Sequence, residues 1–546
     1  MVTFMVKLPA QLGSKNTNNT HADTLRGSYG SGRDWWDVVK YDLHVKFSIT
    51  DSLISGYNDI SLRVLKKGKN LQLDLQEPLI LDSIIFSSNS FTPHTIKEKF
   101  IVKDGNAYFV SDSLLTVNST NIHLFVYYHG KPRIAKRPPW DGGLIWKKDK
   151  NNNPWVSIAC QGLGASVWYP CKDHQMDEPQ SASLWVTCPD TLLTVGNGRL
   201  LGSSKNMDGT STFHWGVSSP INNYTIIPYI GKYVHFNEVY KGEKGNLDMD
   251  YWVLDYNLEK AKKQFADALK MMKAFEYWFG PYPFYKDGYK LVEAPHLGME
   301  HQSATAYGNG FQNGYLGKDL SGSGWGLTWD FIIIHESGHE WFGNNITSRD
   351  IADMWIHEGF TNYSETLFTE FYYGKPAATA YITGIRKNIA NDRPIIGPYN
   401  VNKEGSGDMY NKAANMIHTI RQIINDDHLF RKILRGLNST FYHQTVTSKQ
   451  VEDYISLQSK INFSKVFDQY LRTAKAPVLE YRVEKNLLYY RYTNCIKGFE
   501  MPLKIMQNPS HWIKPNEQWQ IDEAPIGEAA DFSVDPNFYI KTKKVD

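Results

Sequence analysis

Cysteine is scarce in this chain of 546 residues, which contains only Cys160, Cys171, Cys188 and Cys495. Their spacing matches neither a zinc ribbon nor a dense disulfide framework, so the cysteines predict neither a metal site nor a covalent scaffold. An excess of charge is also missing, because the formal net charge is only +2. The sequence therefore gives no reason to expect a nucleic-acid partner.

Long apolar runs are absent as well. The longest, such as FIIIH and LILDSIIF, fall far short of the roughly 20 residues that a membrane-spanning helix needs, so no transmembrane segment is expected. The chain does have length and apolar material, with 546 residues of which 41% are hydrophobic. A chain of this length is too long for a single hydrophobic core, so several domains are expected.

The N-terminal part of the chain is predicted to be a leader followed by a β domain. Residues 1–33 are rich in Gly, Ser, Asn and Thr and have no apolar period, which is typical of a flexible leader. Strand patterns begin at residue 34 and end near the KGEKGN stretch, so the β domain is expected over residues 34–243. Its clearest strand is YDLHVKFSI, with one apolar face made of Tyr41, Leu43, Val45, Phe47 and Ile49.

Helical patterns dominate the next part, residues 244–475. The first helix is predicted to start with Asn257 as its N-cap and to end at Gly280. A break at Lys475-Ala476-Pro477 closes this region, and residues 476–546 return to a strand-like composition. The predicted order is therefore a β domain, a helical domain and a small β domain.

The stretch HESGHEWFGNN carries two histidines four residues apart. On a helix such positions share one face, so His335 and His339 can present two imidazoles to one metal ion, and Glu336 can reach a water beside it. Because this short pattern also arises by chance, a third ligand is needed. Glu358 provides a carboxylate with 18 residues between it and His339. Two imidazoles and one carboxylate leave a coordination position open on zinc, which indicates a catalytic site.

The combination of HESGHEWFGN and WIHEGFTNYSE resembles the zinc aminopeptidase family that includes aminopeptidase N and the leukotriene-hydrolysing aminopeptidases. The stretches CQGLGASVWYPCKDHQMDEP, HLGMEHQS and MYNKAANMIHTI extend the resemblance over most of the chain. It implies a multidomain α+β fold, with an N-terminal β saddle domain, a thermolysin-like and mainly helical catalytic domain and a small C-terminal β-sandwich. The large C-terminal helical domain of many relatives is expected to be absent.

The same resemblance assigns roles to the catalytic residues. It implies one zinc ion per chain, held by His335, His339 and Glu358, with Glu336 as the general base. Tyr410 stands where the family has the tyrosine that donates to the oxyanion.

HLGMEHQS resembles the Gly-x-Met-Glu-Asn exopeptidase motif. Gly298, Met299 and Glu300 keep their places, and the resemblance implies that Glu300 binds the free α-ammonium of the substrate. Leu297 and His301 depart from the motif, and no role is assigned to His301.

Three further residues carry expectations. By the resemblance, Gln161 helps to bind the same amine. His357 is not expected to be a ligand, because its side chain leaves the helix about 100° away from that of Glu358. Glu365 is expected to orient one of the metal ligands without binding the metal itself.

The expected function is zinc-dependent removal of the N-terminal residue from peptides with a free N-terminus. A zinc endopeptidase, which would share the ligands and base but have no use for Glu300, stays open as an alternative. A catalytically silent binding protein on the same scaffold is the other alternative. The sequence does not determine the preferred first residue, the oligomeric state or the compartment, although DTLRGS and WWDVVKYDL resemble exported bacterial members of the family and tilt the expectation towards an extracytoplasmic enzyme.

Overall fold

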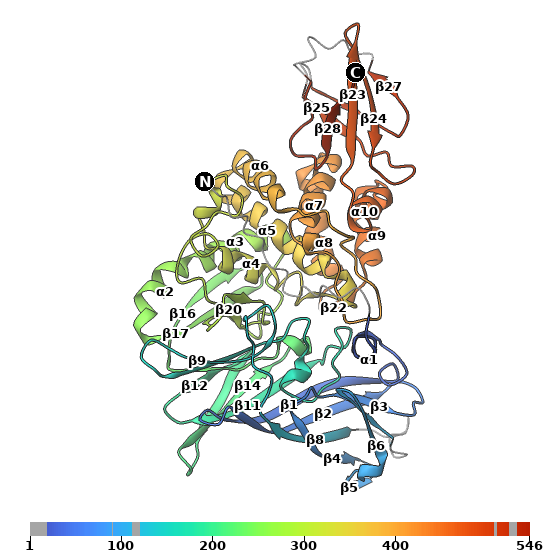
Figure 1. Ribbon diagram of the computed structural model, residues 1–546. Helices are drawn as coiled ribbons and strands as arrows, with labels where there is room; N and C mark the ends of the chain where they lie inside the picture. The colour runs from blue at the N-terminus through green and yellow to red at the C-terminus, as the bar shows by residue number, and fades with distance from the viewer. Residues whose placement is uncertain (1–18, 90, 112–120, 507–509, 523–531) are drawn as a thin grey trace.

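The computed structural model describes residues 19–89, 91–111, 121–506, 510–522 and 532–546. Figure 1 shows β-sheets at the bottom, a layer of helices in the middle and a small β region at the top that contains the C-terminus. The predicted multidomain α+β class is confirmed. Within the described residues, no helix is both long enough and apolar enough to cross a membrane.

The largest sheet of the N-terminal region has eight strands in the order β13-β14-β11-β1-β2-β8-β4-β5. As predicted, Tyr41, Leu43, Val45 and Phe47 on β1 are buried in one core, whereas Ile49 lies in the turn after the strand. The strands of this sheet are β1 (Trp36–Ser48), β2 (Leu53–Val64), β4 (Ile80–Ser88), β5 (Phe91–Thr95), β8 (Ile122–Gly130), β11 (Ser181–Pro189), β13 (Arg199–Lys205) and β14 (Thr210–Val217).

Two smaller sheets complete the N-terminal region, in the orders β12-β15-β10-β9 and β3-β7-β6. All four cysteines of the chain are free thiols, so no disulfide holds these sheets together. The strands are β3 (Leu71–Asp74), β6 (Ile101–Asp104), β7 (Ala107–Val110), β9 (Gly143–Lys148), β10 (Pro154–Ala159), β12 (Leu193–Val195) and β15 (Tyr229–Gly231).

The expected flexible leader falls into two parts. Residues 1–18 lie outside the described residues. Residues 19–33 contain helix α1 (His21–Gly27) and end at Arg33, which is fully buried. The guanidinium of Arg33 donates to three carbonyl oxygens at the end of α1 and pairs with Asp74 at 2.6 Å. Because one buried cation ties the helix to the β domain, this second part is packed and not the flexible segment that its composition predicts.

The second region contains a five-stranded sheet in the order β16-β17-β18-β20-β19. Its strands are β16 (Tyr233–Gly242), β17 (Gly245–Leu254), β18 (Tyr289–Glu293), β19 (Gly298–Met299) and β20 (Thr305–Tyr307). The predicted domain boundary at residue 243 falls in the turn of the β16–β17 hairpin. Both strands of the hairpin therefore belong to this sheet. Strand β19 lies at its edge.

Helices make up most of the rest of this region. They are α2 (Leu258–Gln264), α3 (Ala266–Phe279), α4 (Phe331–Gly338), α5 (Trp355–Tyr373), α6 (Lys375–Gly384), α7 (Asn411–Ile424), α8 (Asp427–Thr440), α9 (Ser448–Ser459) and α10 (Ser464–Leu471). A short parallel pair, β21 (Ile346–Ser348) and β22 (Gln444–Val446), lies among them. Helices α2, α3 and α4 contact the five-stranded sheet.

The helix predicted from Asn257 to Gly280 is divided into α2 and α3. Phe265 lies at the break, with its ring packed against Tyr251 and Tyr307 of the sheet. Asn257 is the N-cap residue of α2, as predicted, but its side chain makes no capping hydrogen bond and donates to Glu293 instead. Tertiary contacts have replaced the local interactions on which the prediction rested.

The C-terminal region contains a four-stranded sheet in the order β27-β24-β23-β28 and a two-stranded sheet, β25-β26. Its buried side chains form one continuous cluster with those of the helical region, whereas the N-terminal region has a separate core. The strands are β23 (Val478–Glu484), β24 (Leu487–Thr493), β25 (Leu503–Ile505), β26 (His511–Ile513), β27 (Gln520–Asp522) and β28 (Lys541–Lys544).

Candidate metal centre and active site

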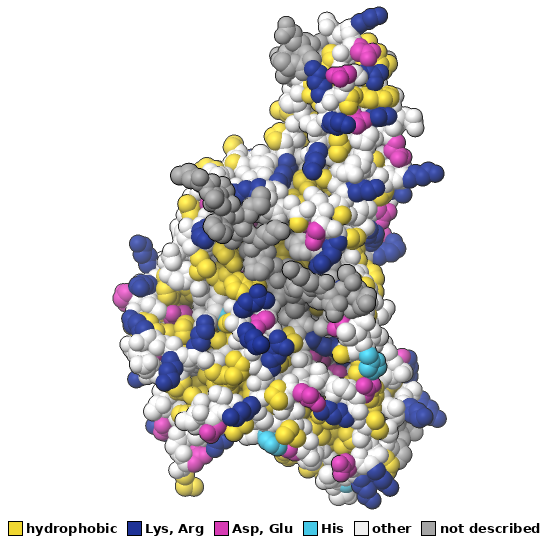
Figure 2. Space-filling model, in the orientation of Figure 1, with side chains coloured by type: hydrophobic (Ala, Val, Ile, Leu, Met, Phe, Trp, Pro, Cys, Tyr) yellow, Lys and Arg dark blue, Asp and Glu magenta, His cyan; other side chains and the backbone are white. Residues whose placement is uncertain are grey.

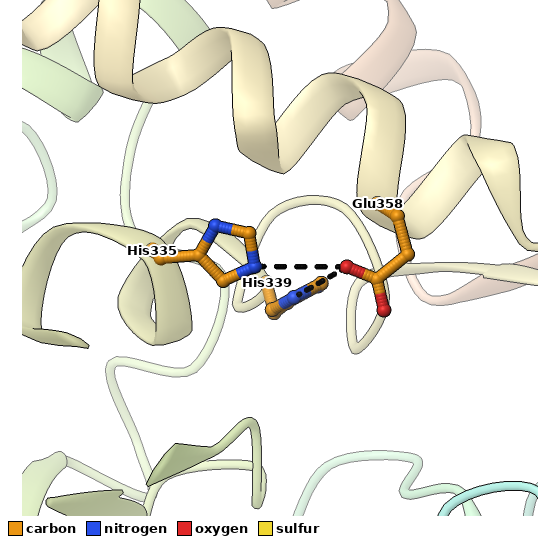
Figure 3. Close-up of side chains that lie close together, drawn as sticks. All are labelled: His335, His339 and Glu358. Atoms are coloured by element: carbon orange, nitrogen blue, oxygen red, sulfur yellow. Dashed lines mark ion pairs between the residues drawn. The ribbon is translucent and has the colours of Figure 1, made fainter. Parts of the chain in front are cut away.

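The three predicted metal ligands meet at one point between two helices. His335 lies in the last turn of α4, His339 is the residue that ends this helix, and Glu358 lies in the first turn of α5. Their ligand atoms all lie within 4.8 Å of one another. Figure 3 shows the Nε2 atoms of both imidazoles pointing at one carboxylate oxygen, Oε2 of Glu358, at 3.6 and 3.4 Å.

These side chains fit a zinc ion. Tetrahedral ligands at about 2.0–2.1 Å from zinc lie about 3.3–3.4 Å apart, close to the two separations found here. Oε2 of Glu358 is buried and accepts no hydrogen bond from a described residue. A buried carboxylate oxygen without a donor is costly, and a cation between the three side chains would satisfy it.

Neighbouring groups hold both imidazoles in the orientation that a metal needs. Nδ1 of His335 donates to Oε1 of Glu365 at 2.7 Å, and Nδ1 of His339 donates to the Phe342 carbonyl at 3.1 Å. Glu365 is itself held by the Tyr381 hydroxyl at 2.6 Å. Because Nδ1 carries the proton in each ring, both Nε2 lone pairs are directed to the same point.

His357 lies outside this arrangement. Its Nε2 accepts from the Ser348 amide at 2.8 Å, and the whole side chain is buried against β21. The side chain therefore faces away from the point at which the imidazoles of His335 and His339 meet.

Glu336 lies against the edge strand β19. A Cβ added to Gly298 would come within 2.6 Å of Oε1 of Glu336, so a larger residue here would displace this carboxylate from its present position. Burial raises the pKa of Glu336 to about 7. A carboxylate with a pKa near neutrality is suited to accepting and returning a proton.

A second carboxylate, Glu300, follows β19 and is only 1% exposed. Its Oε1 accepts from the Gln161 amide at 2.6 Å and from the Tyr224 hydroxyl at 2.9 Å. Both donors bind the same oxygen. The other oxygen, Oε2, is therefore left for a further donor. Burial raises the pKa of Glu300, which a bound cation would reverse.

Gln161 also reaches the metal ligands. Its Nε2 lies 3.5 Å from Oε1 of Glu358. One amide group therefore connects the Glu300 carboxylate with the metal centre.

Tyr410 stands between a short 3₁₀ helix, η8 (Gly407–Met409), and α7. Its ring lies nearly parallel to that of His335, with the centroids 6.1 Å apart. Burial and the nearby Glu358 carboxylate raise the pKa of Tyr410 well above its usual value. The phenol is therefore protonated at neutral pH and can donate a hydrogen bond.

The exopeptidase-like motif contributes side chains to the protein interior as well as to the site. The side chains of Met299 and His301 are buried in the protein interior, with 1% and 0% exposure. Nδ1 of His301 donates to the Tyr229 hydroxyl, which in turn donates to the Ala304 carbonyl. Consequently His301, one of the two residues that depart from the motif, packs inside the protein, and the backbone of Met299 lies at the sheet edge.

Sequence reasoning missed Tyr224. It lies in the stretch INNYTIIPY, which shows no pattern of a site. Its buried hydroxyl reaches Glu300 only because the chain folds back over 76 residues. No local signal in the sequence could have identified it.

The fold and the site together define a class. This class is the zinc-dependent metallopeptidases of the gluzincin type. Their parts are a helix that carries His-Glu-x-x-His, a downstream glutamate on a second helix and an adjacent edge strand. Residues 264–470 match the family model of the peptidase family M1 domain.

Known proteins agree with this class. The chain is 22% identical to endoplasmic reticulum aminopeptidase 1 of Mus musculus over 296 residues, which cover 52% of this chain and 31% of that protein. It is 22% identical to leukotriene A-4 hydrolase of Xenopus laevis over 439 residues, which cover 75% of this chain and 68% of that protein.

The fold is shared with a solved structure, the M1 zinc metallopeptidase from Deinococcus radiodurans. The TM-score is 0.66 at 18% identity, with 81% of this chain and 95% of that chain covered. These comparisons support the assignment of residues 264–470 to a peptidase family M1 domain. The match spans 31% of the length of endoplasmic reticulum aminopeptidase 1, which is about a third of that protein.

Proposed function

We propose that this protein is a zinc-dependent aminopeptidase, which hydrolyses the first peptide bond of peptides that have a free N-terminus. The observation that carries the proposal is the position of Gln161, whose amide contacts Glu300 at 2.6 Å and approaches the metal ligand Glu358 at 3.5 Å. An ammonium held at Glu300 is thereby kept close to the metal centre. Such closeness favours cleavage next to the N-terminus.

His335, His339 and Glu358 would hold the zinc ion, which when bound supplies a Lewis acid that acidifies water and polarises the scissile carbonyl. Glu336 accepts the proton of the attacking water and returns it to the departing amine. Because Gly298 has no side chain, the Glu336 carboxylate has room to move between the attacking water and the departing amine.

Tyr410 stabilises the oxyanion. Its protonated phenol lies beside the ring of His335 and near the Glu358 carboxylate. A hydrogen bond from a preorganised donor to the developing negative charge lowers the barrier.

Glu300 binds the α-ammonium of the substrate. Because Gln161 and Tyr224 both donate to Oε1, Oε2 is directed to the ammonium, and Gln161 offers a further contact at the same end. The backbone of β19, at the edge of the sheet, is available to pair with an extended peptide.

Neither alternative is favoured by an observation of this kind. An endopeptidase has no use for a buried carboxylate beside the metal centre, since an internal segment offers no ammonium to neutralise it. A silent binding protein has no use for the space that Gly298 leaves around Glu336.

A panel of aminoacyl chromogenic substrates and their N-acetylated counterparts tests the proposal. We expect hydrolysis of the free-amine members only, and its loss on treatment with a zinc chelator, with recovery when zinc is restored. Cleavage of internal bonds in N-acetylated peptides at comparable rates would establish the endopeptidase instead. Purified protein without metal-dependent hydrolysis of either set would support the binding protein.

A further inference from the structure

A basic surface lies beside the catalytic sheet. Residues 131–150 include seven lysines and arginines and two aspartates, in a chain whose net charge is only +2. We call the lysines and arginines of this segment the basic rim. Figure 2 shows Lys and Arg side chains gathered on the front face, over the part of the molecule where Figure 1 labels β9 and β20.

The positive charge of the basic rim is not paired. Lys136, Arg137, Lys147 and Lys148 are exposed, and among the described residues the rim forms no ion pair within 4.0 Å. Of the two aspartates in the segment, Asp141 accepts from the backbone amides of Lys136 and Arg137 at 2.7 and 2.8 Å. Asp149 likewise binds backbone amides of its own loop. The rim therefore offers cationic side chains to an anionic ligand.

Two contacts fasten this surface to the segment that enters the active site. Nζ of Lys147 donates to the Pro295 carbonyl at 2.9 Å. Ser157, on the strand paired with β9, contacts Nε2 of His296 at 3.1 Å. These contacts hold the segment that carries the basic rim against residues 295–296, which lie a few residues before Glu300 in the chain.

The order of residues along this segment gives the direction of the substrate. Glu300 takes the ammonium, and Gly298 lies against Glu336, where the first peptide bond is cleaved. Pro295 precedes Gly298 by three residues, in the bend that leads into β19, and its carbonyl accepts from Lys147. An extended peptide that is held by its amine therefore passes the basic rim with the residues that follow the scissile bond.

We propose that the basic rim binds carboxylates of the substrate on the far side of the scissile bond. Resting on the proposed aminopeptidase function, this inference names a substrate class: short peptides, through their C-terminal carboxylate, and longer peptides with acidic side chains soon after the first residue. Ion pairs of this exposed kind are individually weak, but several cations acting on one carboxylate attract it collectively.

Matched peptides test the proposal and separate the two sources of carboxylate. Tetra-alanine with a free C-terminus is compared with its C-terminal amide, and Ala-Ala-Asp-Ala-amide is compared with Ala-Ala-Asn-Ala-amide. In each pair we expect kcat/KM to be about 3- to 10-fold higher for the carboxylate at low salt. The difference should shrink towards one in about 1 M salt, because screening acts over about 3 Å there.

Variants identify the surface responsible. Lys136→Glu combined with Arg137→Glu leaves the backbone contacts of Asp141 intact and should remove or invert both preferences. Lys541→Glu combined with Lys544→Glu changes the net charge equally on β28, in the C-terminal sheet, and should leave them unchanged.

An aminoacyl chromogenic substrate has no chain after the scissile bond and serves as the reference. We expect both double variants to hydrolyse it like the wild type. Equal rates for the members of each peptide pair, or equal effects of the two double variants, would overturn the proposal while the aminopeptidase function stood. Failure of the wild type on the reference substrate would instead count against the aminopeptidase function.

Discussion

Replacing Glu300 with glutamine changes the charge at the proposed amine site while keeping the shape of the side chain. The glutamine oxygen can take the place of Oε1 and accept from Gln161 and Tyr224 as before. Its NH2 group then takes the place of Oε2 and faces the substrate ammonium. An attractive ion pair becomes a contact between two donors.

The size of the effect follows from the burial of this carboxylate, which is 1% exposed. Truncating one partner of a desolvated charge pair costs about 2–5 kcal/mol. Glutamine preserves the hydrogen bonds to Oε1, so a loss of about 2–4 kcal/mol is expected, which corresponds to a decrease of about 30- to 1,000-fold in kcat/KM.

The assay is kcat/KM on aminoacyl chromogenic substrates, together with the zinc content of the purified variant. Zinc should be retained, because Glu300 is not among the three ligands. Glu293→Gln is the matched control, since it also removes a buried carboxylate, one that bonds to Asn257 and the Leu254 amide. Near wild-type kinetics of this control would show that the loss of a buried charge alone does not impair the enzyme.

Two results would refute the reasoning. Unchanged kcat/KM in Glu300→Gln would mean that the ammonium is bound elsewhere. An equal decrease on N-acetylated substrates, which have no ammonium, would mean that the substitution disturbs the site as a whole.

Three further predictions concern the metal centre and the catalytic groups. Glu336→Gln should keep its zinc, measured by metal analysis, and lose kcat by at least about 10²-fold, because the amide cannot accept the proton of water; turnover close to wild type would exclude Glu336 as the base. Tyr410→Phe should lower kcat by about 10²-fold with little change in KM, since the hydrogen bond forms in the transition state, and a change confined to KM would contradict this role. Glu365→Gln, which weakens the acceptor of the His335 Nδ1 proton, should raise the zinc dissociation constant by about 10- to 100-fold in a chelator competition, and wild-type affinity would show that His335 needs no such support.

Much of the metal centre could be predicted because its geometry is local. Two histidines four residues apart on one helix face the same way whatever surrounds them, and the structure gives their ligand atoms that arrangement. The alternation of strand β1 was predictable for the same reason, since its buried face depends only on the period of the chain.

Predictions failed where distant contacts override local preference. Residues 21–27 form a helix tied down by the buried Arg33–Asp74 pair, although the composition of residues 1–33 is that of a flexible leader. The helix from Asn257 is interrupted where Phe265 packs on the sheet. In both cases the partner lies on another element, and a local pattern does not identify it.

The sequence by itself determined which residues could hold a metal and which glutamate lies beside it, because short-range helix geometry sets both. Only the tertiary structure decided how far Glu300, the proposed ammonium site, would lie from the metal centre. That distance depends on Gln161, Tyr224 and Glu300, which approach within 2.6–2.9 Å across separations of 139 and 76 residues. Contacts over such separations are set by the packing of whole domains, and this packing produces no periodic pattern in the sequence.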